Sequence, residues 1–110
     1  MKLQIQKNEI EQKFYVFIAG DMDQTTSTAL EELLEYNMDA CRFDFKQLQN
    51  IETIGIIQWL QFAQQFFSGK KIEYSGCPTN WIMVMHRIPA IYEQAEIASV
   101  YAEYLSLIHI

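Results

Sequence analysis

The segment from residue 41 to residue 56 constrains the fold of this chain more than any other. Phe43 and Phe45 lie on either side of Asp44 in a short β-prone run, and a polar stretch follows them. We therefore expect a buried strand that ends near Asp44, then a loop, then a helix that begins near Thr53. A threonine at this position is a good N-cap, because its oxygen accepts a hydrogen bond from an N–H group of the first turn.

The hydroxyl group of Thr53 fits two different roles. As an N-cap it is purely structural. It is also a point where a phosphate group could be attached, because the unpaired N–H groups and the positive end of the helix dipole favour a negative charge there. A phosphate adds a charge of about −1.5 to −2, which is enough to remake or break an interface. The residues alone leave both roles open.

Strands and helices alternate along the rest of the chain. We expect strands at 2–7, 12–19, 41–45 and 70–75, with a hairpin turn at Asn8 and Glu9. Helices are expected at 27–38, at 53–67, in a segment that Thr79 caps, and, after Pro89, at roughly 90–107. Strands separated by helices favour an α/β fold, a small mixed sheet of about four strands with helices on at least one face and a long C-terminal helix.

Length and charge restrict the function. The chain has 110 residues, half of them hydrophobic, which predicts one compact domain spanning residues 1–110. No apolar run approaches the roughly 18 to 20 residues that a membrane span needs, and the N-terminus lacks a signal-peptide core, so we expect a cytoplasmic protein without membrane insertion. The net charge of −6, with eight scattered Lys and Arg residues, argues against nucleic-acid binding.

The chain offers few residues for catalysis or metal binding. Cys41 and Cys77 are far apart in the sequence, so neither a disulfide framework nor a zinc site is expected. His86 and His109 have no nucleophile or orienting acid nearby, and the four glycines do not form a phosphate-binding loop. We therefore expect no cofactor, no metal and no enzymatic activity. The alternative is a small enzyme or ligand-binding module. Detectable catalytic turnover, or a small molecule that stays bound through purification, would favour it.

Two expected helices carry more apolar residues than one face requires. The helix at 53–67 has no charged residue and is apolar over most of its circumference, which indicates either a partner interface or coverage by neighbouring helices. The helix at 90–107 has two apolar stripes, so that one covers the domain and the other contacts a partner or a second copy in a homodimer, or both are buried. The stripes contain Ile91, Ala95, Ala98, Tyr101, Ala102 and Leu105, and Ile97, Val100, Tyr104 and Leu107.

The order of these features resembles that of the STAS domain, the fold of anti-sigma-factor antagonists and of the cytoplasmic domains of sulfate transporters. In that family a strand ending in Gly-x-Leu-Asp precedes the first helix, a second strand ends in Asp, and Asp-Ser-Ser-Gly-Leu opens the second helix. The counterparts here are the segment 20–23, Asp44 and the segment 52–56. The resemblance covers roughly residues 1 to 90 and implies helices mainly on one side of the sheet. Ile54 replaces the family's second serine, and the expected final helix replaces a short strand, for which 95–97 is the one candidate.

The resemblance implies a non-enzymatic bacterial signalling module that resembles an anti-sigma-factor antagonist. Thr53 falls on the phosphoacceptor position, with threonine in place of serine. Its phosphorylation would release a partner such as a serine/threonine kinase or an anti-sigma factor, as in partner switching. The alternative is a constitutive subunit of an ABC-type lipid-transport complex, bound to the transporter ATPase without phosphate. The residues that we expect to contact the partner are Asp21, Asp23, Glu52, Thr53, Ile54, Gly55, Ile56, Gln58 and Trp59.

Overall fold

The computed structural model describes residues 2–36, 38–93 and 95–98. In these residues the strands form one five-stranded sheet in the order β1-β2-β3-β4-β5. β1 pairs with β2 in antiparallel orientation, and the other neighbouring strands are parallel. The strands are β1 Gln4–Ile10, β2 Lys13–Met22, β3 Ala40–Ile51, β4 Lys71–Ser75 and β5 Ala95–Ile97.

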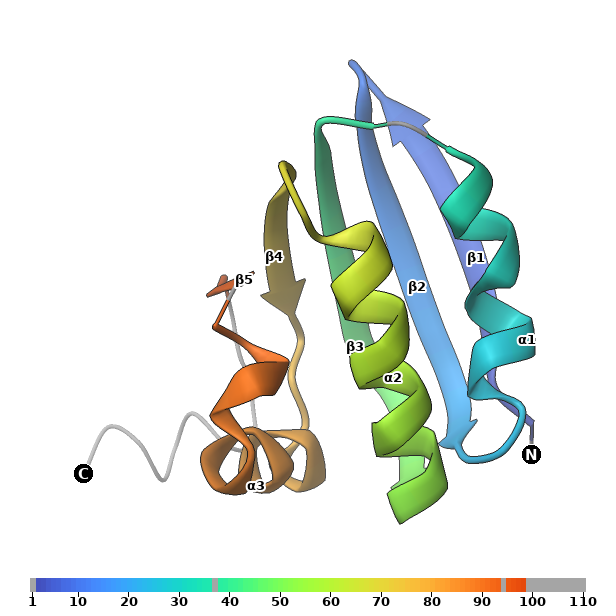
Figure 1. The fold of residues 1–110 in the computed structure, drawn as a ribbon, viewed down its shortest axis with the longest axis vertical. Helices are drawn as coiled ribbons and strands as arrows, with labels where there is room; N and C mark the ends of the chain where they lie inside the picture. The colour runs from blue at the N-terminus through green and yellow to red at the C-terminus, as the bar shows by residue number, and fades with distance from the viewer. Residues whose placement is uncertain (1, 37, 94, 99–110) are drawn as a thin grey trace.

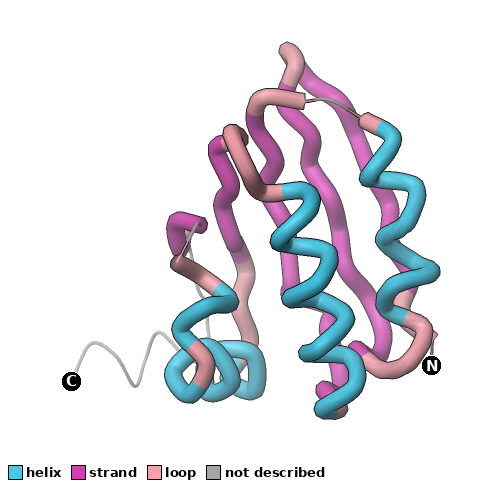
Figure 2. The backbone as a smooth tube through the Cα atoms, in the orientation of Figure 1, coloured by secondary structure: helices cyan, strands magenta, loops and turns pink. Residues whose placement is uncertain are grey.

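The helices connect the parallel strands, as parallel pairing requires. Figures 1 and 2 show α1 and α2 side by side on one face of the sheet, with α3 past the end of β4. This arrangement confirms the expected α/β fold with helices mainly on one face. The helices are α1 Thr26–Leu30, α2 Thr53–Phe66 and α3 Thr79–Arg87, with 3₁₀ helices η1 Glu31–Glu35 and η2 Pro89–Ile91.

Aromatic side chains fill the core between the sheet and α2. The Phe43 ring lies 5.2 Å from the Trp59 ring in an edge-to-face arrangement, and Phe45 stacks on Trp81 at 4.8 Å, both measured between ring centroids. The Trp59 indole N–H donates to the Tyr74 hydroxyl at 3.2 Å, and that hydroxyl donates to the carbonyl oxygen of Ile91 at 2.5 Å. One buried chain of hydrogen bonds therefore links α2, β4 and η2.

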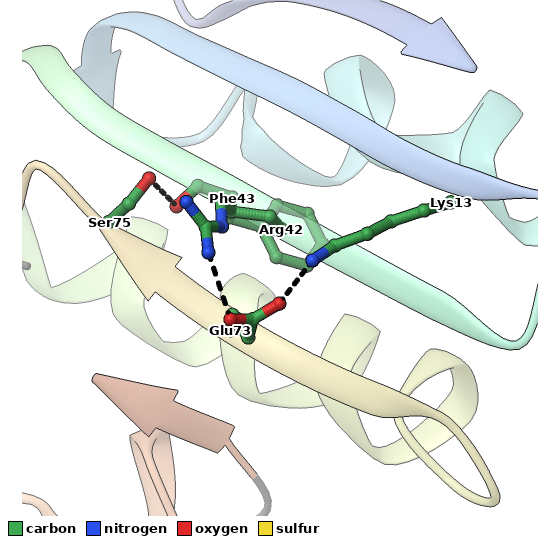
Figure 3. A network of polar contacts seen from close by, with 5 residues as sticks. All are labelled: Lys13, Arg42, Phe43, Glu73 and Ser75. Atoms are coloured by element: carbon green, nitrogen blue, oxygen red, sulfur yellow. Dashed lines mark hydrogen bonds and ion pairs between the residues drawn. The ribbon is translucent and has the colours of Figure 1, made fainter. Parts of the chain in front are cut away.

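The opposite face of the sheet carries a charged network (Figure 3). The Glu73 carboxylate contacts the Lys13 ammonium group at 2.5 Å and the Arg42 guanidinium group at 3.0 Å. Glu73 is only 9% exposed, so these two cations compensate a largely buried charge. The Ser75 hydroxyl, beside it on β4, donates to the Phe43 carbonyl oxygen at 3.5 Å.

The first hairpin turns later than predicted. The turn is at Glu11 and Gln12, with φ of 52° and 67°, whereas Asn8 and Glu9 lie within β1 and pair with β2. Positive φ at both central residues is the geometry that a type I′ hairpin turn requires. Neither residue is one of the glycines or asparagines that usually mark such a turn, so this turn could not be located from residue types.

β3 does not end near Asp44, as the sequence predicted. It continues to Ile51, because β2 pairs with it as far as Met22 opposite Ile51. The register shifts twice along this pair, between Phe17 and Ala19 and between Gly20 and Met22, which places extra residues on β3. These irregularities break the alternation of buried and exposed residues. The exposed polar residues therefore have the sequence pattern of a loop, although they belong to the strand.

The first helix is shorter than the predicted 27–38. α1 ends at Leu30, and η1 continues to Glu35. A 3₁₀ helix has about three residues per turn, which rotates its side chains relative to an α-helix. Leu30 and Leu33 are therefore buried, whereas Leu34 is 40% exposed and Met38 lies beyond the helix.

The predicted helix at 90–107 is wrong over the residues that the structure describes. After η2 the chain forms β5, which pairs Ala95 with Ile72 and Ile97 with Tyr74, and the Ala98 N–H donates to the Tyr74 carbonyl oxygen at 2.7 Å. The edge of β4 supplies backbone partners that a helix would leave unused. Ala95, Ile97 and Ala98 thus do not lie on helical stripes, and the stripe residues from 100 to 107 lie outside the described residues. The candidate extended piece at 95–97 is confirmed as a strand.

Candidate functional site at the start of α2

The residues of the expected site meet where β2 and β3 end. The Glu52 N–H donates to the Met22 carbonyl oxygen at 2.9 Å, which joins the start of α2 to the end of β2. Figure 1 shows this point at the lower edge of the sheet. The segments 20–23 and 52–56, which are far apart in the sequence, therefore form one corner of the molecule.

Gly55 makes this corner possible. A β-carbon on residue 55 would lie 2.2 Å from the carbonyl oxygen of Met22 and 2.7 Å from the backbone nitrogen of Asp23. The first turn of α2 thus lies directly against the backbone at the end of β2, and only a residue without a side chain fits there. Gly55 is buried and serves to position Thr53 and Ile54 at the surface.

Thr53 is not the N-cap of α2. Glu52 occupies that position with extended backbone angles, φ −108° and ψ 154°, and no side chain makes a capping hydrogen bond. Because β3 continues to Ile51, the chain leaves the strand at Glu52, and Thr53 is already the first helical residue. The structural role proposed for its hydroxyl group is therefore wrong. Its side chain is exposed on the first turn. Thr79 is likewise the first residue of α3, with Pro78 as the N-cap.

The two aspartates of the segment 20–23 hold the local backbone. One Asp21 carboxylate oxygen accepts from the backbone N–H and the side-chain amide of Asn50, both at 3.1 Å, and so ties β2 to β3. One Asp23 oxygen accepts from the backbone N–H of Thr25 at 2.9 Å and from its hydroxyl at 2.5 Å. The Thr25 hydroxyl, followed by its backbone N–H, holds the pKa of Asp23 below its ordinary value.

Most of the apolar surface of α2 belongs to the domain's own core. The sequence left open whether neighbouring elements or a partner cover this helix, and neighbouring elements cover most of it. Trp59, Phe62 and Phe66 are buried, whereas Ile54 and Ile57 are 42% and 46% exposed. These two isoleucines lie three residues apart on one side of the helix, next to Thr53. A fully buried Trp59 does not reach the surface, so we remove it from the surface that contacts a partner.

Gln58 is engaged within the molecule. Its side-chain oxygen accepts from the backbone N–H of Ser27 at 2.9 Å, which ties α2 to the start of α1. Ile56 is half-buried against the core.

Among the described residues, no three His, Cys, Asp or Glu side chains form a group that could hold a metal ion. In the same part of the chain, no helix has the length and apolar character needed to cross a membrane.

Comparison with known proteins gives matches by structure alone. No protein-family model matches the chain, and no curated protein matches it by sequence. An anti-sigma factor antagonist from Mycobacterium paratuberculosis superposes with a TM-score of 0.66 at 9% identity, over 99% of this chain and 96% of that one. A sulfate transporter family protein from Wolinella succinogenes superposes with the same TM-score at 15% identity, over 94% and 92%. The chain has the STAS fold.

A third structure extends this result. The anti-sigma factor antagonist SpoIIAA, in its unphosphorylated form, superposes with a TM-score of 0.58 at 9% identity over 98% of this chain and 96% of that one. At such low identities the shared property is the STAS fold itself. Two of the short motifs that suggested the resemblance meet at the close approach of Met22 and Gly55.

Seven of the nine expected residues lie in the two segments that meet at this corner, but only some of them are at its surface. Glu52, Thr53 and Ile54 are exposed, Gly55 is buried, and the two aspartates are half-buried. The sequence prediction missed Ile57 as a surface residue. Its spacing of three residues from Ile54 was the available signal. We call Glu52, Thr53, Ile54 and Ile57 the α2 surface.

Proposed function

We propose that this chain is a non-enzymatic interaction module that binds a protein partner through the α2 surface and releases it when Thr53 is phosphorylated. The observation that carries the proposal is the exposed Thr53 hydroxyl, which makes no capping hydrogen bond and lies beside two exposed isoleucines. Exposed apolar side chains on a helix that itself carries no Lys or Arg are typical of an interface centre.

The proposed switch is electrostatic. A phosphate on Thr53 would introduce a charge of about −1.5 to −2 beside the Glu52 carboxylate. Within a contact that excludes water, such a group carries a large desolvation cost unless a cation of the partner meets it. The phosphorylated form therefore loses the partner. The anti-sigma factor antagonists among the similar structures support a partner of the kinase or anti-sigma-factor class. The proposal places the module in the cytoplasm, where ATP-dependent kinases act.

Affinity capture from the native cell tests this function. Wild-type and Thr53→Glu baits are compared, and mass spectrometry identifies the partners and any phosphate on Thr53. Ser68→Glu is the matched control, because it adds the same charge to an exposed residue just beyond the opposite end of α2. We expect a kinase or sigma-regulatory protein with wild type and Ser68→Glu but not with Thr53→Glu.

Two results would contradict the switch. Equal retention of the partner by Thr53→Glu would show that charge at this position does not control binding. Stoichiometric recovery of a transporter ATPase, without phosphate on Thr53, would identify a constitutive subunit of a transport complex instead. The transporter family protein among the similar structures supports that second candidate.

A further inference from the structure

A groove lies between the end of β3 and α3. Its volume is about 340 Å³, within the lower part of the range of about 300–1,000 Å³ that is usual for binding pockets. Ile51, in its wall, precedes Glu52 and Thr53 directly in the chain, so the groove adjoins the α2 surface. We call it the β3-α3 groove. Its lining residues are Asn50, Ile51, Asn80, Met83, Val84 and Arg87.

One continuous face of α3 forms the longer wall of the β3-α3 groove. Asn80, Met83, Val84 and Arg87 follow one another at the spacing of a single helix face, whereas Trp81 and Met85 point into the core. Met83 is 52% exposed, and Val84 and Ile51 are half-buried. A flexible methionine beside two branched side chains forms an adaptable apolar site.

Hydrogen bonds hold the polar walls of the groove in place. The Asn80 side-chain amide donates to the carbonyl oxygen of Gln49, so α3 is tied to β3 beside the groove. The Asn50 side-chain amide donates to the Asp21 carboxylate at 3.1 Å. These bonds fix the groove before any ligand arrives, which lowers the entropic cost of binding.

Arg87 supplies the only cationic group of the groove lining. It is exposed and makes no ion pair with any residue in the described ranges, although the whole chain carries a net charge of −6. A guanidinium group presents a planar set of donors that matches a carboxylate. An unpaired arginine beside an apolar site therefore selects a ligand that combines an acid with an apolar side chain.

We propose that the β3-α3 groove binds a partner segment in which an Asp or Glu stands next to a large apolar residue. The carboxylate pairs with Arg87, and the apolar side chain packs among Ile51, Met83 and Val84. This inference rests on the proposed function and specifies the chemistry of its partner. It also gives a reason for release, because an acidic segment bound beside Thr53 would be repelled by a phosphate there.

A displayed library of random peptides, selected on the full chain, tests the groove. We expect enrichment of peptides that carry Asp or Glu within two positions of Leu, Ile, Phe or Trp. The most enriched peptide is then made with a fluorescent label and titrated against wild type, Arg87→Glu, Met83→Ser and Lys71→Glu. Lys71→Glu is the matched control, since it changes the net charge equally from an exposed position on β4.

We expect Arg87→Glu and Met83→Ser to weaken binding at least tenfold, a loss of about 1.4 kcal/mol for each tenfold step. Lys71→Glu should bind like wild type, and a peptide with Lys in place of its acid should recover binding to Arg87→Glu. Enrichment of peptides without an acid, or equal binding to Arg87→Glu and Lys71→Glu, overturns the proposal. A wild-type dimer that Arg87→Glu converts to a monomer overturns it in favour of a second copy.

The native partner separates this inference from the proposed function. A partner that Arg87→Glu retains and Thr53→Glu loses overturns the groove and leaves the phosphorylation switch standing. A partner that Arg87→Glu loses and Thr53→Glu retains supports the groove and overturns the switch. Circular dichroism of each variant establishes that it is folded.

Discussion

The carbonyl oxygen of Met22 lies 2.2 Å from the point that a β-carbon on Gly55 would occupy. Met22 is the last residue of β2 and Gly55 lies in the first turn of α2, so neither backbone position can move without displacing its element. We expect Gly55→Ala to lower the free energy of unfolding by about 1–3 kcal/mol or more, measured by urea unfolding. Gly69→Ala is the control. Its added β-carbon meets no atom within 4 Å, so the only cost is the backbone strain of a φ of +74°. Equal losses in the two variants would contradict the close approach.

Thr53→Ala should change stability by less than about 0.5 kcal/mol, because the hydroxyl makes no capping hydrogen bond. Thr53→Glu should gain about 0.3–1 kcal/mol at low salt from the helix dipole. Thermal and urea unfolding measure both. A loss above 1 kcal/mol in the alanine variant would show that Thr53 has a structural role. A stable Thr53→Glu protein ensures that any lost binding is not a consequence of unfolding.

Tyr74→Phe removes the hydroxyl that joins Trp59 to Ile91 and leaves two buried polar groups without a partner. Each such group costs about 1–3 kcal/mol, so we expect a loss of at least that size in urea unfolding. Tyr92→Phe, at a residue that is 37% exposed, is the matched control and should be nearly neutral. Similar stability of the two variants would argue against the buried chain of hydrogen bonds.

Acid should remove the contribution of Glu73 to stability. Lys13 first, and then Arg42, lower the pKa of this carboxyl group below its ordinary value of 4.5. A pKa that is lower in the folded state gives stability that is fully present above pH 4.5 and is lost as the pH falls through the folded value. Glu73→Gln should therefore be less stable than wild type at neutral pH and lose less stability in acid.

Urea midpoints measured from neutral pH to below pH 4.5 test this dependence on Glu73. Glu31→Gln, on the exposed side of η1, is the control for the loss of one carboxylate. If Glu73→Gln and wild type decline in parallel as the pH falls, the ion pairs with Lys13 and Arg42 do not stabilise the folded state.

The two cysteines should be inert in the folded protein. Burial raises the pKa of both Cys41 and Cys77 to about 12, so their thiols stay protonated at neutral pH, and both are fully covered. We expect a thiol reagent such as dithionitrobenzoate to react with both at once in denaturant and only at the rate of unfolding in buffer. Fast reaction of one thiol in buffer would show that its surroundings open locally.

Local sequence patterns were sufficient to predict the order of strands and helices where the hydrophobic periodicity matches the secondary structure. The alternation of apolar runs and amphipathic helices predicted the α/β order. The resemblance placed expected partner contacts in both segments, 20–23 and 52–56, and the structure shows that these segments meet. The length of β3 could not be predicted, because its register with β2 shifts where exposed residues such as Lys46 and Asn50 interrupt the alternation. The role of Thr53 depended on that length, since a strand ending at Ile51 moves the N-cap to Glu52.

The helix predicted after Pro89 was wrong for a different reason. Its apolar spacing fits a helix, but residues 95–97 pair with β4, and such pairing depends on a strand far away in the sequence. The Arg87 side of α3 was also missed. Its residues fit an exposed helix face, and nothing in the sequence alone places that face beside the end of β3.

The unequal lengths of β3 and β4 also bear on solubility. β4 pairs with β3 only as far as Ser75 opposite Asp44, whereas β3 continues to Ile51. A strand edge extending beyond its neighbour is a template on which other chains can add a strand and aggregate. Here the Asp44 side chain accepts the N–H of Lys46, and Asn80 donates to the Gln49 carbonyl oxygen. Two side chains thus satisfy backbone groups that an incoming strand would need, which makes the addition of a strand along this edge of β3 less favourable.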